Sequence, residues 1–274
     1  MSNLVSTQWL ADHLYTDDMV VLDATWHLPT LKRDARAEYA ATHIPNARFF
    51  DLDKTSDQNT ALPHMLPTAN NFAAQMGALG ISNTKHVIAY DTYGLFSAAR
   101  CWWMFKVFGH ENVSVLDGGF KKWVLEKRPV ETGEPAPAME ANFAATLNLE
   151  MVRNIDEVAA TNSQIADARS PARFRGEEPE PRPGVKPGHI PGAFNVHYAT
   201  LLNVDGTLKP KAELATLFAN SGIDVEKPVI TSCGSGVTAA ILSLALTELR
   251  ATNHALYDGS WAEWGASDQP LELG

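Results

Sequence analysis

The stretch Val229–Ile241 reads VITSCGSGVTAAI and combines three local signals. The apolar run VITS is typical of a buried strand, and it ends directly before Cys233. Gly234 and Gly236 let the chain turn tightly after the cysteine. Apolar residues at three- and four-residue steps begin near Val237 and indicate a helix. The stretch therefore predicts a strand, a tight loop that begins with a thiol, and a helix.

A cysteine in such a loop has two interpretations. Free cysteines are often small buried apolar residues, and Cys101, inside the apolar run AARCWWMF, is predicted to be one of them. At Cys233, in contrast, the N–H groups of a curled loop would point at the sulfur, and the start of the helix would add partial positive charge. Both effects favour a thiolate. Cys233 is therefore predicted to be a nucleophile in a loop that can hold an anion bonded to its sulfur.

The chain contains one pattern twice. Four segments of the first half return in the second half in the same order, with offsets of 144, 146, 142 and 141 residues. The pairs are VVLDATW with QIADARS, HIPNARFF with HIPGAFNV, HVIAYD with PVITSC, and LDGGFKKW with YDGSWAEW. A period of this length is the size of a domain rather than of a small repeat, so the 274 residues are predicted to be a duplicated domain.

The boundary between the two copies is predicted at ETGEPAPAMEANFAATLN, which contains two prolines and little periodicity. The predicted N-terminal domain is 1–130, the linker is 131–148, and the C-terminal domain is 149–274. Asp91 occupies the position of Cys233 in the repeat. Because a carboxylate cannot attack sulfur, the N-terminal domain is predicted to be catalytically inactive and the C-terminal domain to be catalytic.

Each half alternates short apolar runs with helical stretches. The predicted strands are Val20–Leu22, Val87–Tyr90, Val113–Leu116, Ile165–Ala166, Val229–Ser232 and His254–Tyr257. The clearest predicted helices are Met151–Ala160, Lys211–Ser221 and Val237–Leu249. This alternation predicts an α/β fold in which each domain is a mainly parallel sheet flanked by helices. Functional groups gather at the carboxyl ends of such strands, which is where Asp91 and Cys233 fall.

Composition limits the classes of function. The net charge of −10 argues against nucleic acid or an anionic membrane as the main partner. No apolar run is long enough to span a bilayer, and the N-terminus lacks the pattern of a signal or transit peptide. Two cysteines make no disulfide framework, so we expect a reducing cytoplasm. The His, Asp and Glu residues show no metal-ligand spacing, and we expect neither a metal nor a cofactor.

With these features the chain resembles the two-domain rhodanese superfamily. The resemblance rests on the tandem halves and on HIPGA, CGSGVTA and DGSWAEWG, and it covers essentially the whole chain. CGSGVTA is more similar to the members that use mercaptopyruvate than to those that use thiosulfate, which usually carry basic residues directly after the cysteine. The resemblance implies two rhodanese-like domains and a sulfurtransferase that moves sulfur from 3-mercaptopyruvate through a Cys233 persulfide, releasing pyruvate. The acceptor would be thioredoxin, a small thiol or cyanide.

The resemblance also implies the site residues. Cys233 matches the nucleophile, and Ser235, His64 and Asp53 match a proposed Ser–His–Asp relay for protons. The remaining residues are implied to bind the substrate: Arg173 in ARFRG, Arg182 in EPRPG, and the loop residues Gly234, Gly236, Val237 and Thr238. Two guanidinium groups suit a ketoacid because they offer paired, charge-assisted hydrogen bonds to its carboxylate and ketone.

Several alternatives stay open at this point. His64 could cap a turn and Asp53 could be an ordinary loop carboxylate, while the two arginines could form a solvated ion-pair cluster with neighbouring glutamates. A cysteine phosphatase needs an arginine commonly about six residues after the cysteine, where this chain has Ala239. A non-catalytic interaction module is a second rival class. The third alternative is a thiosulfate sulfurtransferase, although Gly234 and Ser235 give the loop no positive charge for a dianion.

Overall fold

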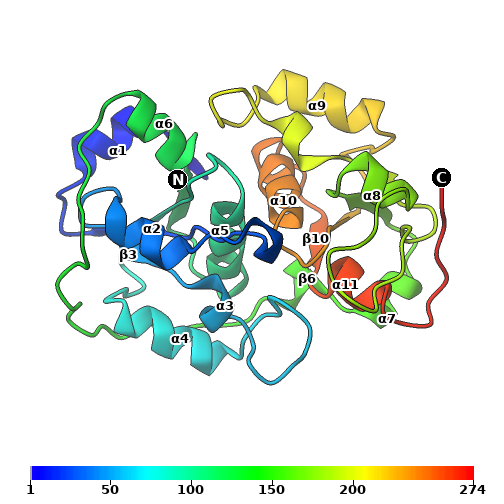
Figure 1. The fold of residues 1–274 in the computed structure, drawn as a ribbon, viewed down its shortest axis with the longest axis horizontal. Coiled ribbons are helices and arrows are strands. Elements are labelled where there is room, and N and C mark those ends of the chain that lie inside the picture. The colour runs from blue at the N-terminus through cyan, green and yellow to red at the C-terminus, as the bar shows by residue number, and fades with distance from the viewer. Residues whose placement is uncertain (1) are drawn as a thin grey trace. The chain divides into compact units, whose positions relative to one another are not determined.

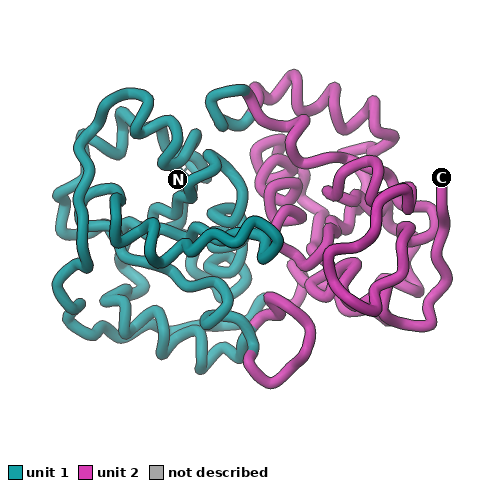
Figure 2. Tube along the Cα trace, viewed as in Figure 1, with its two compact units in different colours: residues 1–57, 67–148, 204–208 teal, residues 58–66, 149–203, 209–274 magenta. Residues whose placement is uncertain are grey.

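The computed structural model describes residues 2–274, and its backbone divides into two compact units (Figure 2). Unit 1 comprises residues 1–57, 67–148 and 204–208, and unit 2 comprises residues 58–66, 149–203 and 209–274. Each unit therefore consists mainly of one half of the sequence but includes a short segment of the other half. A single division at the linker does not describe these units, although the linker residues themselves belong to unit 1.

Unit 1 is a parallel five-stranded sheet with helices (Figure 1). Its strands lie in the order β1-β5-β4-β2-β3, and their bounds are β1 Leu4–Val5, β2 Met19–Asp23, β3 Arg48–Phe49, β4 His86–Tyr90 and β5 Val113–Leu116. The helices are α1 Thr7–His13, α2 Ala35–Ala41, α3 Leu52–Thr55, α4 Ala69–Ala78, α5 Ser97–Val107 and α6 Gly119–Leu125, with a 3-10 turn at Pro29–Leu31.

Unit 2 repeats this topology with the strand order β6-β10-β9-β7-β8, all parallel. Its strands are β6 Val152–Arg153, β7 Gln164–Asp167, β8 Phe194–Asn195, β9 Val229–Ser232 and β10 His254–Tyr257. Its helices are α7 Ile155–Ala159, α8 Pro171–Arg175, α9 Lys211–Asn220, α10 Ala239–Glu248 and α11 Ser260–Trp264, with 3-10 turns at Leu149–Met151 and Tyr198–Leu201. The identical strand order confirms the predicted α/β fold and its duplication.

The central strands form the core of each unit because both of their faces are covered. Every residue of β9 and all but the first residue of β4 are buried, which explains why these strands read as short apolar runs. The helix that follows the central strand is also buried in each unit, namely α5 after β4 and α10 after β9. Cys101 lies in α5 with no exposed surface, and burial raises the pKa of its thiol well above the ordinary value. The prediction of a buried, structural Cys101 is confirmed.

The predicted helix at Met151–Ala160 is wrong in its first half. Val152 and Arg153 instead pair with Leu256 and Tyr257 as the edge strand β6. The helix begins only after Asn154, whose side chain accepts the Glu157 N–H while the Glu157 carboxylate accepts the Asn154 N–H. This capping box fixes the start of α7 and leaves the preceding residues free to extend the sheet. The predicted helices near α9 and α10 end within two residues of the observed bounds.

Two histidines at equivalent repeat positions support the turn that leads into the edge strand of each unit. In unit 1, the His43 ring stacks on Tyr39 at 4.2 Å, and its Nδ1 lies 2.8 Å from the Tyr39 carbonyl oxygen. In unit 2, the His189 ring stacks on Phe174 at 3.8 Å, and its Nδ1 lies 2.9 Å from the Phe174 carbonyl oxygen. The duplication thus extends from topology to individual side-chain contacts.

Each unit contains one short segment from the other half of the sequence, 58–66 in unit 2 and 204–208 in unit 1. These two exchanged segments are attached in the same way. In unit 2, the Leu66 N–H donates to the carboxylate of Asp258, directly after β10, at 2.8 Å. In unit 1, the Leu208 N–H donates to the carboxylate of Asp117, directly after β5, at 2.8 Å. Asp117 and Asp258 are equivalent in the repeat LDGGF and YDGSW. One acidic residue at one place in the topology therefore holds the exchanged segment of each unit.

No helix among residues 2–274 combines the length and the apolar character that crossing a membrane requires.

Candidate active site

Cys233 is the first residue after β9, and the backbone that follows turns sharply before α10 begins at Ala239. Its side chain is almost completely buried. Gly236 has φ 77°, a left-handed conformation that glycine adopts without steric cost, so the sequence places a glycine where the loop reverses. The structure therefore places the thiol at the carboxyl end of a central strand, as the sequence pattern predicts.

The carbonyl groups of this loop are held by α11. The Trp261 N–H donates to the Cys233 oxygen and the Ala262 N–H to the Gly234 oxygen, both at 2.9 Å. In a trans peptide the N–H points opposite to the C=O, and the described chain contains no cis peptide. The N–H groups of Gly234 and Ser235 are therefore directed away from α11. Donors arranged in this way form an environment in which negative charge on a ligand is favoured.

Three predicted site residues meet in unit 2 beside this loop. The Ser235 Oγ lies 2.9 Å from Nδ1 of His64, and Arg182 donates from Nη2 to the same Oγ at 3.4 Å. Ser235 and His64 are both buried. His64 belongs to the segment 58–66 and has φ 61°, a conformation that costs free energy outside glycine and is frequent at functional sites. A hydroxyl, an imidazole and a guanidinium are thus within hydrogen-bond reach two residues from Cys233.

Arg173 is held by a buried chain of charges. Its Nε and Nη2 donate to Glu180 at 3.3 and 2.5 Å, and Glu180 also accepts from Arg169 at 2.9 Å. Arg169 in turn pairs with Asp167 at 2.7 Å. Burial alone would lower the pKa of Arg169, but the charges of Asp167 and Glu180 outweigh it and raise that pKa. Because the Glu180 carboxylate is 4% exposed, this is not the solvated cluster considered above.

The same chain of charges positions Arg173 over the loop. A Cβ built on Gly234 would lie 3.1 Å from Nη2 of Arg173, so the guanidinium passes directly above the residue that follows the cysteine. The solvated ion pair of this region is instead Arg175 with Glu177, at 2.7 Å and exposed. The structure therefore brings one predicted arginine to Ser235 and the other to Gly234.

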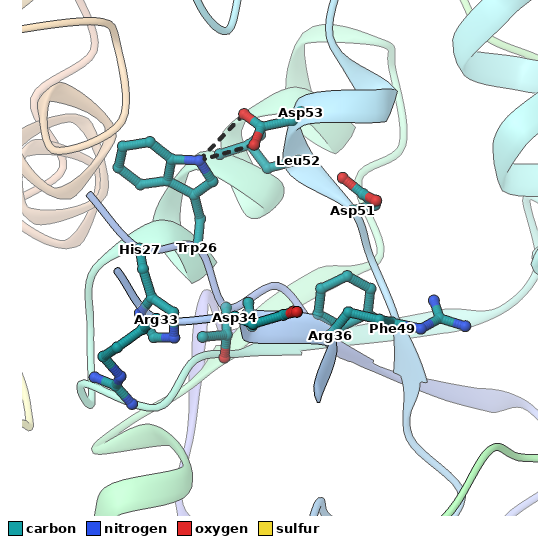
Figure 3. A pocket seen from close by; sticks show the side chains of 11 residues that line it. Trp26, His27, Arg33, Asp34, Arg36, Phe49, Asp51, Leu52 and Asp53 are labelled. Atoms are coloured by element: carbon teal, nitrogen blue, oxygen red, sulfur yellow. Dashed lines mark hydrogen bonds between the residues drawn. The ribbon is translucent and has the colours of Figure 1, made fainter. Parts of the chain in front are cut away.

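Asp53 lies in unit 1, at the start of α3. The Trp26 indole N–H donates to both of its carboxylate oxygens, at 3.1 and 3.2 Å (Figure 3). These residues line a pocket of about 320 Å³ at the carboxyl end of β2. The other lining residues are Thr25, His27, Arg33, Asp34, Ala35, Arg36, Phe49, Asp51 and Leu52. Arg33 and Arg36 form ion pairs with Glu38 and Glu134, so the two guanidinium groups of this pocket are paired.

Asp91 fills the loop of unit 1 with its own carboxylate. Oδ1 accepts the N–H groups of Tyr93 and Gly94, at 2.9 and 3.1 Å, and Oδ2 accepts those of Phe96 and Ala98, at 2.7 and 2.9 Å. The side chain is completely buried. Burial raises the pKa of Asp91, and the four backbone hydrogen bonds oppose that rise. The loop of unit 1 therefore already contains an acceptor for its N–H groups.

Sequence reasoning did not single out Ser260 or Arg169. Ser260 is fully buried, and its Oγ accepts the N–H groups of Cys233 and Gly236, at 3.2 and 3.1 Å. The repeat offered a signal, because YDGSW has a serine where LDGGF has Gly119. Among residues 2–274, no group of three or more His, Cys, Asp or Glu side chains is arranged to hold a metal ion.

The comparisons with known proteins show the family of the chain. The rhodanese-like domain model matches residues 6–126 and again residues 150–267, so the chain belongs to the rhodanese family. It is 42% identical to the 3-mercaptopyruvate sulfurtransferase of Rattus norvegicus, over 97% of this chain and 93% of that protein. It is 41% identical to a thiosulfate sulfurtransferase of Cricetulus griseus, over 95% and 91%. Its fold matches the crystal structure of SseA, a 3-mercaptopyruvate sulfotransferase from Escherichia coli, with a TM-score of 0.87, 41% identity and coverage of 95% and 99%.

Proposed function

We propose that this chain is a 3-mercaptopyruvate sulfurtransferase. Full-length relatives with that activity support the assignment. The observation that carries it is the meeting of Ser235, His64 and Arg182 beside the Cys233 loop, at 2.9 and 3.4 Å. These groups suit a small ketoacid that carries a thiol, because they offer a donor for its oxygens and a path for its proton.

In the proposed reaction the Cys233 thiolate attacks the sulfur of mercaptopyruvate. A new S–S bond forms and the C–S bond breaks, and its electron pair stays on the methylene carbon as the enolate of pyruvate. The thiol proton of the donor moves to that carbon, which gives pyruvate and a persulfide anion on Cys233. An acceptor thiol or cyanide then attacks the outer sulfur and takes it away as a persulfide or thiocyanate, which restores the thiolate.

We assign the donor's carboxylate and ketone to Arg173 and Arg182, since charge-assisted hydrogen bonds from guanidinium groups are stronger than neutral ones. The developing enolate would be stabilised by the same groups. The loop residues Gly234, Gly236, Val237 and Thr238 would surround the transferred sulfur. The orientation of the Gly234 peptide, set by the bond from Trp261 to the Cys233 oxygen, supports this role.

We assign proton movement to Ser235 and His64, with Asp53 as the third member of the relay. The Ser235–His64 distance of 2.9 Å supports the first pair. For Asp53 the support is that both oxygens of its carboxylate accept the Trp26 indole N–H and are thereby held in one orientation. The test is the pH dependence of kcat in His64→Ala and in Asp53→Asn. A variant whose profile loses its acidic or basic limb identifies the changed residue as one that takes part in proton movement.

We propose that 1–130 is an inactive rhodanese-like domain, 131–148 is a linker and 149–274 is the catalytic domain. The four hydrogen bonds that occupy the Asp91 carboxylate support inactivity. For partners we propose a small-molecule donor and a thiol acceptor such as thioredoxin or a small thiol, or cyanide. For location we propose the cytoplasm, because both cysteines are free and reducing conditions preserve thiols.

A thiosulfate sulfurtransferase is the second candidate, and the relative from Cricetulus griseus favours it at nearly the same identity. The test compares kcat/KM for the two donors at equal concentration. We expect mercaptopyruvate to be preferred, because the residues after Cys233 carry no charge to bind a dianion. Faster use of thiosulfate would replace the first assignment with the second. Loss of all transfer in Cys233→Ser is expected with either donor.

A further inference from the structure

We propose that Ser260 is a positioning residue for the Cys233 loop, and that its hydroxyl holds the backbone in the shape that forms and keeps the persulfide. The inference rests on the proposed sulfur transfer, and it concerns a residue outside the Ser–His–Asp relay. It assigns a task to the fully buried hydroxyl of the first residue of the short helix α11.

The hydrogen bonds of Ser260 leave it no capacity for proton transfer. Its Oγ accepts the N–H groups of Cys233 and Gly236, at 3.2 and 3.1 Å, and donates to the Tyr257 oxygen at 2.9 Å. A hydroxyl has one proton and two lone pairs, and all three are used. Ser260 therefore acts on the reaction through the loop rather than through a direct contact with the donor.

These bonds select which N–H groups of the loop face the sulfur ligand. Ser260 takes the N–H groups of Cys233 and Gly236, while the next two residues hold the Cys233 and Gly234 carbonyls. The peptide planes between these points are fixed as a result, and the Gly234 and Ser235 N–H groups are turned to the other side. Without the hydroxyl, the buried N–H groups of Cys233 and Gly236 lose their acceptor. Because an unsatisfied buried donor costs free energy, the peptides of the loop would rotate toward other acceptors.

The equivalent position in unit 1 shows that the fold does not need a side chain here. Gly119 has φ 53° and Ser260 has φ 49°, so both units use the left-handed conformation that glycine tolerates best. A Cβ built on Gly119 would lie 2.5 Å from the backbone carbonyl oxygen of Asp91. Gly94 is the repeat equivalent of Gly236, and in unit 1 its N–H is accepted by the Asp91 carboxylate instead. A serine retained at a strained position, in the one unit whose loop lacks an internal acceptor, indicates that its hydroxyl has a task.

The test uses two variants that remove the hydroxyl and differ in strain. Ser260→Ala keeps the left-handed conformation with a Cβ, whereas Ser260→Gly relieves it, so Ser260→Gly is expected to have the higher Tm of the two. Ser243→Ala is the matched control, because Ser243 is equally buried in unit 2 but hydrogen-bonds Thr231 rather than the loop. Pyruvate release from mercaptopyruvate gives kcat and KM per mole of folded protein. Intact mass, followed after the donor is removed, gives the lifetime of the sulfur on Cys233.

We expect both Ser260 variants to lose about tenfold to a hundredfold in kcat, because the donors that the loop aims at the sulfur are displaced. KM should stay within about twofold, since Arg173 and Arg182 are not touched, and the persulfide should lose its sulfur faster than in the wild type. Ser243→Ala should keep the wild-type kcat and persulfide lifetime. The two Ser260 variants should lose similar activity in spite of their different Tm values, which a merely structural role would not produce.

A folded Ser260→Gly with wild-type kcat and wild-type persulfide lifetime would overturn the inference. A loss that appears only in KM would also overturn it, since the hydroxyl would then act on donor binding. If the wild-type enzyme itself releases no pyruvate and its Cys233 takes no sulfur from either donor, the proposed function fails instead. The wild-type arm therefore separates the two outcomes.

Discussion

The loops at Asp91 and Cys233 occupy the same place in two copies of one fold. They differ in which side chain accepts the N–H groups of the loop. In unit 1 a carboxylate belonging to the loop accepts four of its N–H groups. In unit 2 the corresponding side chain is a thiol, and a serine from outside the loop accepts only two. The difference teaches that the fold supplies backbone N–H donors in both loops, whereas the side chain at position 91 or 233 decides whether the loop itself accepts them.

Removal of the Cys233 thiol should have the largest effect on sulfur transfer. Cys233→Ser should lower sulfur transfer by at least about a thousandfold, since the nucleophile is lost. The measurement is pyruvate release, with intact mass to detect sulfur on the protein. The control is Cys101→Ala, which should still take up one sulfur, because the Cys101 thiol is fully buried in α5 and burial raises its pKa well above the ordinary value. Normal turnover in Cys233→Ser would remove the nucleophile assignment.

Removal of the Asp91 carboxylate should lower the stability of unit 1. Asp91→Ala deprives four buried N–H groups of their acceptor, and we expect the free energy of unfolding to fall by about 4 kcal/mol. Urea unfolding followed by fluorescence gives the value. Asp12→Ala, which changes an exposed carboxylate of α1, should cost less than about 0.5 kcal/mol. Equal stability of the two variants would mean that the carboxylate does not hold the loop.

The open loop should depend on the arginine beside it. Arg182→Ala should reduce kcat/KM for mercaptopyruvate by about 30-fold, the value of one charge-assisted hydrogen bond, and reduce it less for thiosulfate. Arg175→Ala is the control, because Arg175 pairs with Glu177 at the surface and should leave both donors unaffected. An equal loss with both donors would show that Arg182 does not recognise the ketoacid.

A smaller effect compares Asp23 with Asp167, which are equivalent in the repeat. Asp167 is paired with Arg169, whereas the matching neighbour of Asp23 is Thr25, and burial raises the pKa of Asp23 from 3.8 to about 6. A carboxyl group with a raised folded-state pKa contributes stability below its unfolded pKa, and that stability is lost as the pH rises through the folded pKa. The wild-type protein should therefore lose stability between about pH 4 and pH 6 through this group.

Asp23→Asn should remove this loss of stability. The difference in unfolding free energy between the variant and the wild type should therefore be more favourable to the variant at pH 7.5 than at pH 4.5, by about 1 to 2 kcal/mol. Urea melts at both pH values give the difference. Asp17→Asn, at an exposed carboxylate, should not change the pH dependence. An Asp23→Asn variant that is as pH-dependent as the wild type would show that another group causes the slope.

The sequence predicts best where a signal is local and strong. The central strands follow from short apolar runs, the helix after Cys233 follows from apolar residues at three- and four-residue steps, and the internal repeat indicates the duplicated fold. The two-residue strands β1, β3, β6 and β8 carry no period that a sequence can display, and β6 was expected to be helical for that reason. A capping box at Asn154, rather than the apolar spacing, decides where α7 begins.

The site was predictable in its residue types but not in its supports. Cys233, Ser235, His64 and Arg182 were found from motifs, and the structure brings the last three together. Ser260 was missed because its task depends on a bond to a loop 24 to 27 residues away along the chain. Glu180 was considered only as a partner in a solvated cluster, because burial between two arginines is a property of the folded state. The roles assigned to these residues stay predictions.

The exchanged segments make the two copies mutually dependent. Segment 58–66 carries His64 into unit 2, and segment 204–208 returns from the other half into unit 1, each held by the same aspartate of the repeat. A fragment cut at the linker would leave residues 149–274 without His64, which hydrogen-bonds Ser235, and residues 1–130 without the Leu208 N–H that donates to Asp117. Neither half of the sequence is therefore a self-sufficient module, because each unit is completed by a segment from the other half.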